Sequence, residues 1–190
     1  MVRQLSLLAG CAPSPAAELE RIQLGRGAWV DHQPNWFPEP ERLLDTLAEV
    51  LPWRSMSRPM YDRIVDVPRL VVSFDRDVVP EPLIELTERM EARYGRPIRS
   101  VGANLYRDGD DSVAWHTDRV PEPSDCVIAI VSVGQPRPFL LRPPDGQPVR
   151  RFVLGDGDLL AMGGTAQATC QHAVPKVRHA GERISVMFRS

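Results

Sequence analysis

Lysine is almost absent from this sequence. Among the 23 basic residues of the 190-residue chain, Lys176 is the one lysine and all the others are arginines. The planar guanidinium of arginine matches carboxylates and phosphates through paired hydrogen bonds, so this bias favours anion recognition at individual sites. The 25 acidic residues leave a net charge of -2, which excludes a general attraction to nucleic acid. Any such binding would need a local basic patch.

Cysteines and long apolar runs are also scarce. The three cysteines, Cys11, Cys126 and Cys170, lie far apart, which argues against a disulfide framework and a zinc ribbon. No run reaches the roughly 18 apolar residues of a membrane span. Residues 8–11 are similar to a lipoprotein cleavage box, but the apolar stretch there is shorter than the roughly 7–15 residues that a signal needs. We therefore expect a reduced, cytoplasmic protein without membrane contact, and a monomer.

Proline and glycine are frequent, with 19 and 13 residues, and they argue against a coiled coil. An apolar fraction of 43% and the low net charge argue against intrinsic disorder. The length suits one domain with a sizeable core. We expect residues 1–24 to be an N-terminal extension and residues 25–190 to form a single domain.

Two segments show the apolar spacing of helices. In residues 39–51 apolar side chains recur at helical intervals until a proline follows. The second segment, residues 80–95, begins with prolines and ends with a glycine, which is typical of helix termini. Residues 53–68 show no clear period and are predicted to be irregular.

Much of the remaining chain is typical of short strands separated by turns rich in glycine and proline. The expected strands cover residues 25–31, 70–74, 100–106, 112–117, 126–133, 139–142, 150–153, 158–162 and 183–189. Two early helices followed by many strands predict a mostly β fold, a sandwich or barrel with flanking helices.

Two histidines and one carboxylate form a candidate metal site. His116 and Asp118 stand two apart at the end of a predicted strand, and residues so spaced project to the same face. A third ligand must come from elsewhere, and His172 follows several strands later. Such a set is the facial triad of non-haem iron(II) oxygenases, which leaves coordination positions open. A solvated turn is the alternative interpretation of the His-x-Asp pair taken alone.

The last predicted strand alternates strictly between two faces. One face carries Ile184, Val186 and Phe188, and the other carries Arg183, Ser185, Met187 and Arg189. The arginine-bearing face is either the solvated side of a sheet or the lining of a barrel. Inside a barrel, two buried cations would need an anionic partner such as a small dicarboxylate.

Three ordered motifs match the signature of a known family. The segment from Asn104 to Asp118 is similar to the pattern N-x-Y-x-D-G-x-D…H-x-D. The segment from Met162 to Lys176 is similar to the part that carries a distal histidine, and residues 183–189 resemble an R-x-N-x-T-F-R strand. Together they resemble the AlkB family of 2-oxoglutarate- and iron(II)-dependent dioxygenases. The resemblance covers residues 50–190.

The resemblance implies a double-stranded β-helix, or jelly-roll, core supported by the two helices. The iron(II) ligands, and hence the catalytic residues, would be His116, Asp118 and His172. The residues that bind the cosubstrate 2-oxoglutarate would be Asn104, Tyr106, Arg183 and Arg189. Arg183 would pair with its distal carboxylate, and Arg189 would lie near the end that chelates iron. Molecular oxygen would be the other cosubstrate.

The sequence departs from the family at three positions. Ser185 and Met187 stand where the family strand has asparagine and threonine. Serine can still form hydrogen bonds, whereas methionine lacks a hydroxyl, so we expect a drier inner face. Val120 stands where DNA-repair members carry an acidic residue that helps to read the damaged base. The residues therefore support iron and cosubstrate binding more strongly than base reading by a carboxylate.

For function, the resemblance implies oxidative demethylation of N-alkylated nucleobases, such as 1-methyladenine and 3-methylcytosine, in DNA or RNA. Such a reaction releases formaldehyde, succinate and carbon dioxide, and it serves the repair of DNA alkylation damage. The target base would leave the stack and enter a pocket. One alternative is a dioxygenase of the same fold that hydroxylates or demethylates a substrate other than nucleic acid. Another is a non-catalytic β-barrel that only binds its ligand.

Residues 52–79 are similar to the substrate lid of the family. The candidate substrate-binding residues are Trp53, Tyr61, Phe74 and Arg69, the three aromatic ones for base stacking. Ordinary packing is an equal alternative for each aromatic residue. The arginines of this region form a candidate phosphate-contacting surface, for which a solvated face is the alternative. These arginines are Arg54, Arg58, Arg63, Arg69 and Arg76.

Overall fold

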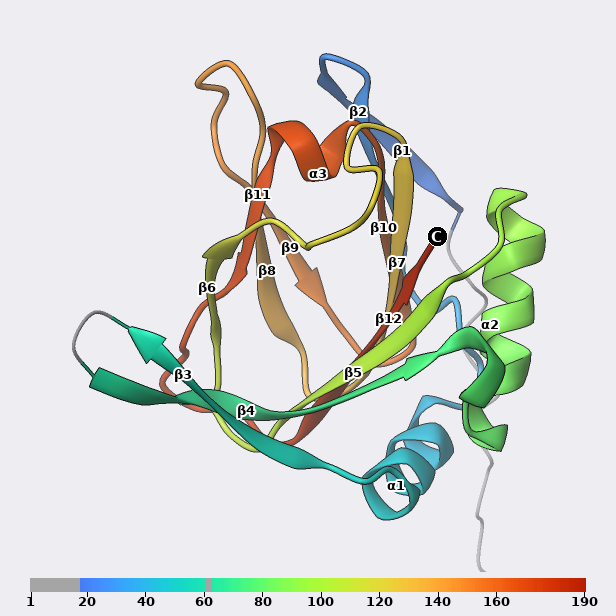
Figure 1. Cartoon of the computed structure of the whole chain (residues 1–190), viewed down its shortest axis with the longest axis vertical. Coiled ribbons are helices and arrows are strands. Elements are labelled where there is room, and N and C mark those ends of the chain that lie inside the picture. Colours follow the sequence, from blue (N-terminus) through green and yellow to red (C-terminus); the bar gives the residue numbers. More distant parts are fainter. Residues whose placement is uncertain (1–17, 61–62) are drawn as a thin grey trace, which may run out of the picture.

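Two antiparallel sheets face each other in the computed structural model, which describes residues 18–60 and 63–190 (Figure 1). The larger sheet has eight strands in the order β1-β2-β10-β7-β12-β5-β4-β3, and the smaller has four in the order β6-β11-β8-β9. Every strand pair among the described residues is antiparallel, as in a jelly roll. The predicted mostly β fold with flanking helices is confirmed.

The elements follow one another along the chain with these bounds. They are β1 (Glu20–Gly25), β2 (Ala28–Gln33), α1 (Pro40–Val50), β3 (Arg54–Met60), β4 (Arg63–Asp75), the 3-10 helix η1 (Arg76–Val78), α2 (Glu81–Tyr94), β5 (Ser100–Tyr106), β6 (Val113–His116), β7 (Cys126–Gly134), β8 (Arg137–Arg142), β9 (Arg150–Leu154), β10 (Asp158–Gly164), α3 (Ala166–Thr169), β11 (Gln171–Val174) and β12 (Arg183–Arg189).

The two predicted helices are confirmed as α1 and α2, which lie outside the larger sheet (Figure 1). α1 buries Leu43 and Leu47, and α2 buries Leu83 and Met90, all in one cluster with side chains of the sheet. Gly95 ends α2 in the left-handed conformation, with φ 63°. In the part of the chain that the structure describes, neither these nor any other helix is long and apolar enough to cross a membrane.

The alternation along β12 separates two layers of core. Ile184, Val186 and Phe188 belong to the cluster beneath the helices. Met187 belongs to a second cluster between the sheets, where Phe139 of the smaller sheet also lies. The face of β12 that carries the arginines therefore lines the interior of the fold, which decides between the two alternatives that the sequence left open.

The N-terminal prediction is wrong in its bounds. A strand was expected at residues 25–31, but Gly25 and Gly27 have φ 91° and 82° and form a turn between β1 and β2. Glycine adopts positive φ at little cost, so these residues mark the turn of a hairpin rather than the start of a strand. The predicted extension at residues 1–24 overlaps β1, and residues 1–17 lie outside the described part.

The region predicted to be irregular, residues 53–68, is also different. It contributes to the hairpin β3–β4, whose second strand continues through the predicted strand at residues 70–74. β4 is ordered by its neighbours, because it pairs with β3 on one side and with β5 on the other. In Figure 1 this hairpin reaches beyond the barrel. Two four-residue elements, α3 and β11, were not predicted.

Candidate metal centre

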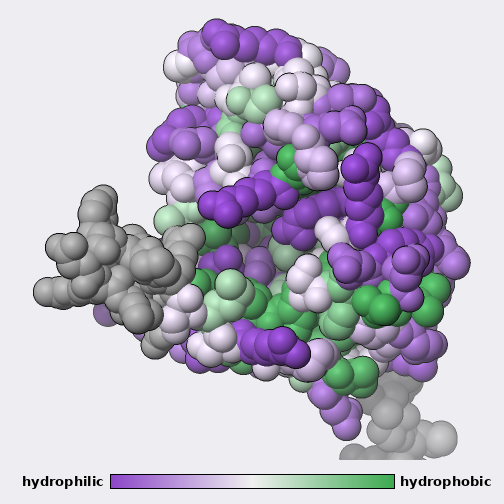
Figure 2. All heavy atoms as spheres, viewed as in Figure 1, coloured by the Kyte–Doolittle hydropathy of each residue, from purple (hydrophilic) through white to green (hydrophobic). Residues whose placement is uncertain are grey.

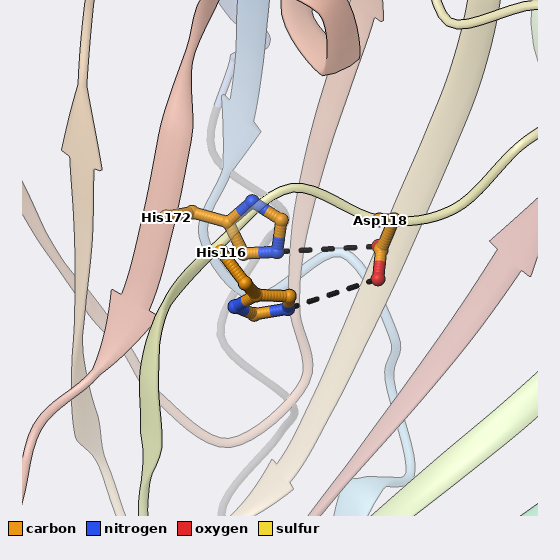
Figure 3. A group of neighbouring side chains, drawn as sticks. All are labelled: His116, Asp118 and His172. Carbon is orange, nitrogen blue, oxygen red and sulfur yellow. Dashed lines mark ion pairs between the residues drawn. The ribbon is translucent and has the colours of Figure 1, made fainter. Parts of the chain in front are cut away.

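The structure brings the three predicted iron ligands together, as Figure 3 shows. His116 is the last residue of β6 and lies opposite His172 of β11 in the strand ladder. Asp118 follows in the segment after β6. Its Oδ1 lies 3.7 Å from Nε2 of His116, and its Oδ2 lies 4.0 Å from Nε2 of His172. One ligand atom of each residue falls within 4.8 Å of the others, which suits a single ion.

The surroundings of the histidines fix which nitrogen can face a metal. Nδ1 of His116 lies 2.9 Å from the carbonyl of Ala114, so Nε2 is left to face Asp118. His172 is buried and stacks on Phe139, with ring centroids 5.4 Å apart. Burial, followed by the nearby His116, lowers the pKa of His172 to about 4. The imidazole is therefore neutral at physiological pH, which is the form that binds a metal.

Beside the triad lies a small cavity of about 90 Å³ that extends toward Arg183. Arg183 is 1% exposed, and its Nε donates to Oγ of Ser132 at 2.9 Å. Its Nη1 is buried and has no hydrogen-bond partner among the described residues. Burial lowers the pKa of Arg183 as well. A buried cation with an unused donor calls for an anion, so the cavity fits the distal carboxylate of 2-oxoglutarate.

The other predicted cosubstrate residues also line this cavity. The ring of Tyr106 lies next to the Arg183 guanidinium, and its centroid is 5.1 Å from Cζ of Arg183. Asn104 donates through Nδ2 to the sulfur of Met187 at 3.3 Å and accepts from Nε of Arg69 at 3.1 Å. Nη2 of Arg189 lies 3.5 Å from Oδ1 of Asp118, at the metal end. The structure thus places all four residues in the lining of the cavity that also contains the triad.

A second buried arginine, Arg137, was missed by the sequence reasoning. It is fully buried, and its terminal nitrogens donate to the carbonyls of Asp108, Asp111 and Pro175 at 2.8, 2.7 and 3.1 Å. These carbonyls precede β6 and follow β11, so Arg137 ties together the two strands that carry the histidine ligands. No period or motif marked it, because the strand was expected to begin two residues later.

A wider groove of about 650 Å³ opens outside the metal centre. Its lining includes Arg54 and Met56 of β3, Asp118, Arg119 and Arg189. The face in Figure 2 is hollowed near its centre, with mostly hydrophilic side chains above the hollow and hydrophobic ones along its lower rim. The β3–β4 hairpin, predicted as a lid, forms one wall of this groove.

The candidate substrate residues described by the structure do not lie in one site. Trp53 donates through Nε1 to the carbonyls of Leu47 and Ala48 at 3.2 Å, and both Trp53 and Phe74 pack against the core beneath the helices. Neither lines the groove or the inner cavity, so the packing alternative describes where they lie. Arg69 lines the inner cavity. Tyr61 lies outside the described residues.

The predicted arginine cluster is divided in the same way. Arg54 lines the groove and Arg69 the inner cavity, whereas Arg76 forms an ion pair with Glu91 of α2 at 3.1 Å. That pairing lowers the pKa of Glu91. The side chains of Arg58 and Arg63 lie outside what the structure describes. Of the described arginines, Arg76 is therefore taken up by an ion pair with α2, whereas Arg54 and Arg69 line the two cavities.

Residues 65–189 match the 2OG-Fe(II) oxygenase superfamily. The chain belongs to this superfamily. His116, Asp118 and His172 are its iron-binding triad, with 2-oxoglutarate and oxygen as cosubstrates. A solvated turn is thus excluded as the explanation of the His-x-Asp pair.

Among curated proteins, the alpha-ketoglutarate-dependent dioxygenase alkB homolog 3 of Rattus norvegicus is 33% identical over 176 residues. The match covers 80% of this chain and 60% of that protein. The chain thus spans less than two thirds of the relative's length. The predicted resemblance to the AlkB family is confirmed by this match.

Solved structures confirm the fold. A 2OG-Fe(II) oxygenase family oxidoreductase from Burkholderia pseudomallei superposes with a TM-score of 0.61 at 22% identity, over 85% of this chain and 84% of that one. A prolyl hydroxylase from Trichoplax adhaerens, solved with a hypoxia inducible factor peptide fragment, gives 0.62 at 12% identity, over 84% and 82%. Identities this low speak for the fold alone.

Proposed function

We propose that the protein is a cytoplasmic iron(II)- and 2-oxoglutarate-dependent dioxygenase that demethylates N-alkylated nucleobases, such as 1-methyladenine and 3-methylcytosine, in DNA or RNA. The products would be the repaired base, formaldehyde, succinate and carbon dioxide, and the role would be repair of alkylation damage. One observation carries the iron- and 2-oxoglutarate-dependent part of the proposal: the iron triad shares a cavity with a buried arginine that has an unused donor. Iron, when bound, supplies the activation of oxygen at the positions that three protein ligands leave open.

Different residues of the chain bind the two ends of 2-oxoglutarate. Arg183 holds the distal carboxylate of 2-oxoglutarate, and Tyr106 and Asn104 line the path toward the metal. Arg189 stands at the metal end, where it also approaches Asp118. A fixed orientation of the cosubstrate lowers the entropy that must be lost at the reaction step.

The groove supports a nucleic-acid substrate through its charge. Arg54 and Arg119 line it, and neither guanidinium has a partner within residues 18–60 and 63–190. Two free guanidiniums beside the metal suit the phosphates that flank an extruded base. Val120 is half-buried and offers no carboxylate to the base, so base selection would rest on shape and on these phosphate contacts.

The alternative, a dioxygenase of the same fold acting on another substrate class, also has support. The Trichoplax adhaerens enzyme shares the fold and was solved with a peptide. Neither Trp53 nor Phe74 is at the groove to stack on a base. Substrate class is therefore the point that the experiment must decide.

The direct test is a coupled assay of succinate and formaldehyde. The protein would be supplied with iron(II), 2-oxoglutarate, oxygen and a panel of DNA and RNA oligonucleotides, single- and double-stranded, carrying 1-methyladenine or 3-methylcytosine. We expect equal amounts of the two products from at least one oligonucleotide. His116→Ala should abolish both, and His179→Ala, which removes an exposed histidine away from the triad, should change neither.

Replacing an arginine inside the groove and one outside it tests where the nucleic acid binds. Arg119→Gln should raise the KM for the oligonucleotide and reduce its salt dependence, since one phosphate contact is lost. Arg151→Gln removes an exposed arginine on β9, outside the groove, and should do neither. Succinate formation with a peptide or small metabolite, together with no formaldehyde from any methylated oligonucleotide, would reject the proposal in favour of the alternative.

A further inference from the structure

The three iron ligands are not held in the same way. His116 and His172 belong to paired strands and face each other in the ladder, which fixes their backbones. Asp118 lies beyond the end of β6, in the segment that leads to β7. A carboxylate on such a segment needs another support if it is to meet the histidines without rearrangement when a metal binds.

That support comes from Gln167 in α3. Oε1 of Gln167 accepts a hydrogen bond from the backbone N–H of Asp118 at 2.9 Å. The side chain is 4% exposed, so water does not compete for this bond. Its Nε2 lies 3.9 Å from the sulfur of Met162, which is a weak contact. Asp118 lies outside the strands, so this hydrogen bond to Gln167 holds its backbone where strand pairing would otherwise hold it.

α3 is itself anchored to the N-terminal hairpin. Thr165, which precedes α3, donates through Oγ1 to the carbonyl of Arg26 at 2.7 Å and through its N–H to that of Gly27 at 3.4 Å. The approach is so close that a Cβ on Gly164 would lie 2.1 Å from the carbonyl oxygen of Gly27. This hairpin lies outside residues 65–189, which match the superfamily.

The other end of α3 leads directly to the second histidine strand. Cys170 is buried, its N–H donates to the carbonyl of Ala166 at 2.9 Å, and β11 begins at the next residue. α3 thus connects the anchor on the hairpin, the backbone of Asp118 and the strand of His172. The two segments that supply these ligands are separated by several strands in the sequence but share this short helix.

We propose that Gln167 is a positioning residue of the iron site, which holds Asp118 at its place opposite His172 before the metal binds. Groups that orient metal ligands typically contribute about 10- to 100-fold to metal affinity. The inference rests on the iron triad and is independent of the substrate class. Its readouts are metal binding and amide exchange, so failure of the nucleic-acid proposal would leave them unchanged.

The variant Gln167→Met tests this role, because methionine has a similar length and volume and cannot accept the bond from Asp118 in the same way. Manganese(II) would be titrated into the protein as a redox-inert probe. We expect its dissociation constant to rise by about 10- to 100-fold. The matched control is Thr169→Val, which removes the bond from Oγ1 to the carbonyl of Thr165 in the same helix and should leave the affinity unchanged.

The two outcomes separate a positioning role from a structural one. Thermal melting should show both metal-free variants folded, with midpoints close to each other. Weaker manganese binding in Gln167→Met alone supports the proposal. Equal binding by Gln167→Met, Thr169→Val and the unchanged protein overturns it.

A measurement on the unchanged protein decides the case if Gln167→Met does not fold. Hydrogen exchange of the metal-free protein should show the amide of Asp118 protected, although it lies outside any strand. The amide of Arg119, which has no such partner in the described structure, serves as the reference. Exchange of Asp118 as fast as that of Arg119 would show that Gln167 does not hold it, and would overturn the proposal.

Discussion

Two buried arginines lie close to the ring of Tyr106, and they differ in their hydrogen-bond partners. Arg137 lies 5.5 Å and Arg183 lies 5.1 Å from the ring centroid of this residue. Arg137 directs its terminal nitrogens to backbone carbonyls of the loops beside β6 and β11. Arg183 lines the inner cavity, and its Nη1 has no partner in the described part of the chain.

This difference separates framework from binding site. Burial lowers the pKa of both arginines, so each carries a desolvation cost. Around Arg137, whose Nε also lacks a partner among the described residues, that cost is offset at both terminal nitrogens by protein carbonyls, which are always present. Around Arg183 it is offset in full only when an anion enters. Burial of an arginine thus says little about its role, whereas the identity of its hydrogen-bond partners says much.

The largest effect is expected from Arg183→Met. Removing one partner of a buried ion pair costs about 3–5 kcal/mol, so the affinity for 2-oxoglutarate should fall by at least about 100-fold. Titration calorimetry with the manganese-loaded protein measures this directly. The free energy of unfolding without ligand should change by no more than about 1 kcal/mol, because a buried cation is removed along with its bond to Ser132.

Arg137→Met should have the opposite profile. It leaves three carbonyls without their donor. The bond to the carbonyl of Asp111 is buried and the other two are partly buried, so the loss is at most about 1–3 kcal/mol for each, partly offset by the loss of a buried charge. We expect the free energy of unfolding in urea to fall by about 3 kcal/mol. Below the unfolding transition, 2-oxoglutarate should still bind. An unchanged stability with lost binding would reverse the two assignments.

A third, smaller effect concerns the cosubstrate itself. A ligand present at about 100 times its dissociation constant stabilises the folded state by about 2.7 kcal/mol. The manganese-loaded protein should therefore melt at a higher temperature with 2-oxoglutarate, and Arg137→Met should melt lower but show the same shift. If Arg183→Met also kept the full shift, the anion would have to bind elsewhere.

The smallest effect is expected from Met187→Leu, which changes the lining of the inner cavity. The swap conserves volume and removes the sulfur that accepts the bond from Asn104. Substitutions of this kind usually cost less than about 1.5 kcal/mol. We expect a change of a few-fold in the KM for 2-oxoglutarate and no loss of stability, measured by succinate formation and urea unfolding. A large loss would mean that Met187 contacts the cosubstrate rather than only filling space.

Much of the site could be predicted from the sequence, because its residues form local patterns. His116 and Asp118 stand two apart at a strand end, and the alternation of β12 placed Arg183 and Arg189 on one face. His172 was a candidate third ligand from its place after several predicted strands, and the family resemblance assigned it, since nothing in its own short segment predicted a strand. The bounds of β5 and β12 were predicted without error, because both are strands with clear apolar content.

What could not be predicted depends on distant partners. Arg137 and Gln167 act through backbone groups far away in the sequence, and no local pattern reveals such contacts. Trp53 looked like a base-stacking residue, but its indole N–H is satisfied by carbonyls of α1. Residues 53–68 of the β3–β4 hairpin region have no clear apolar period, and β4 is ordered by pairing with β3 and β5. Tertiary neighbours decided each of these cases.

The most direct test of the contrast between the two arginines is a double-mutant cycle between protein and ligand. The dissociation constants of 2-oxoglutarate and of 2-oxobutyrate, which lacks the distal carboxylate, would be measured for the manganese-loaded protein, Arg183→Met and Arg137→Met. We predict that the protein prefers 2-oxoglutarate by at least about 100-fold, that Arg183→Met loses this preference, and that Arg137→Met keeps it. A preference that survives in Arg183→Met, or that disappears in Arg137→Met alone, would contradict the account.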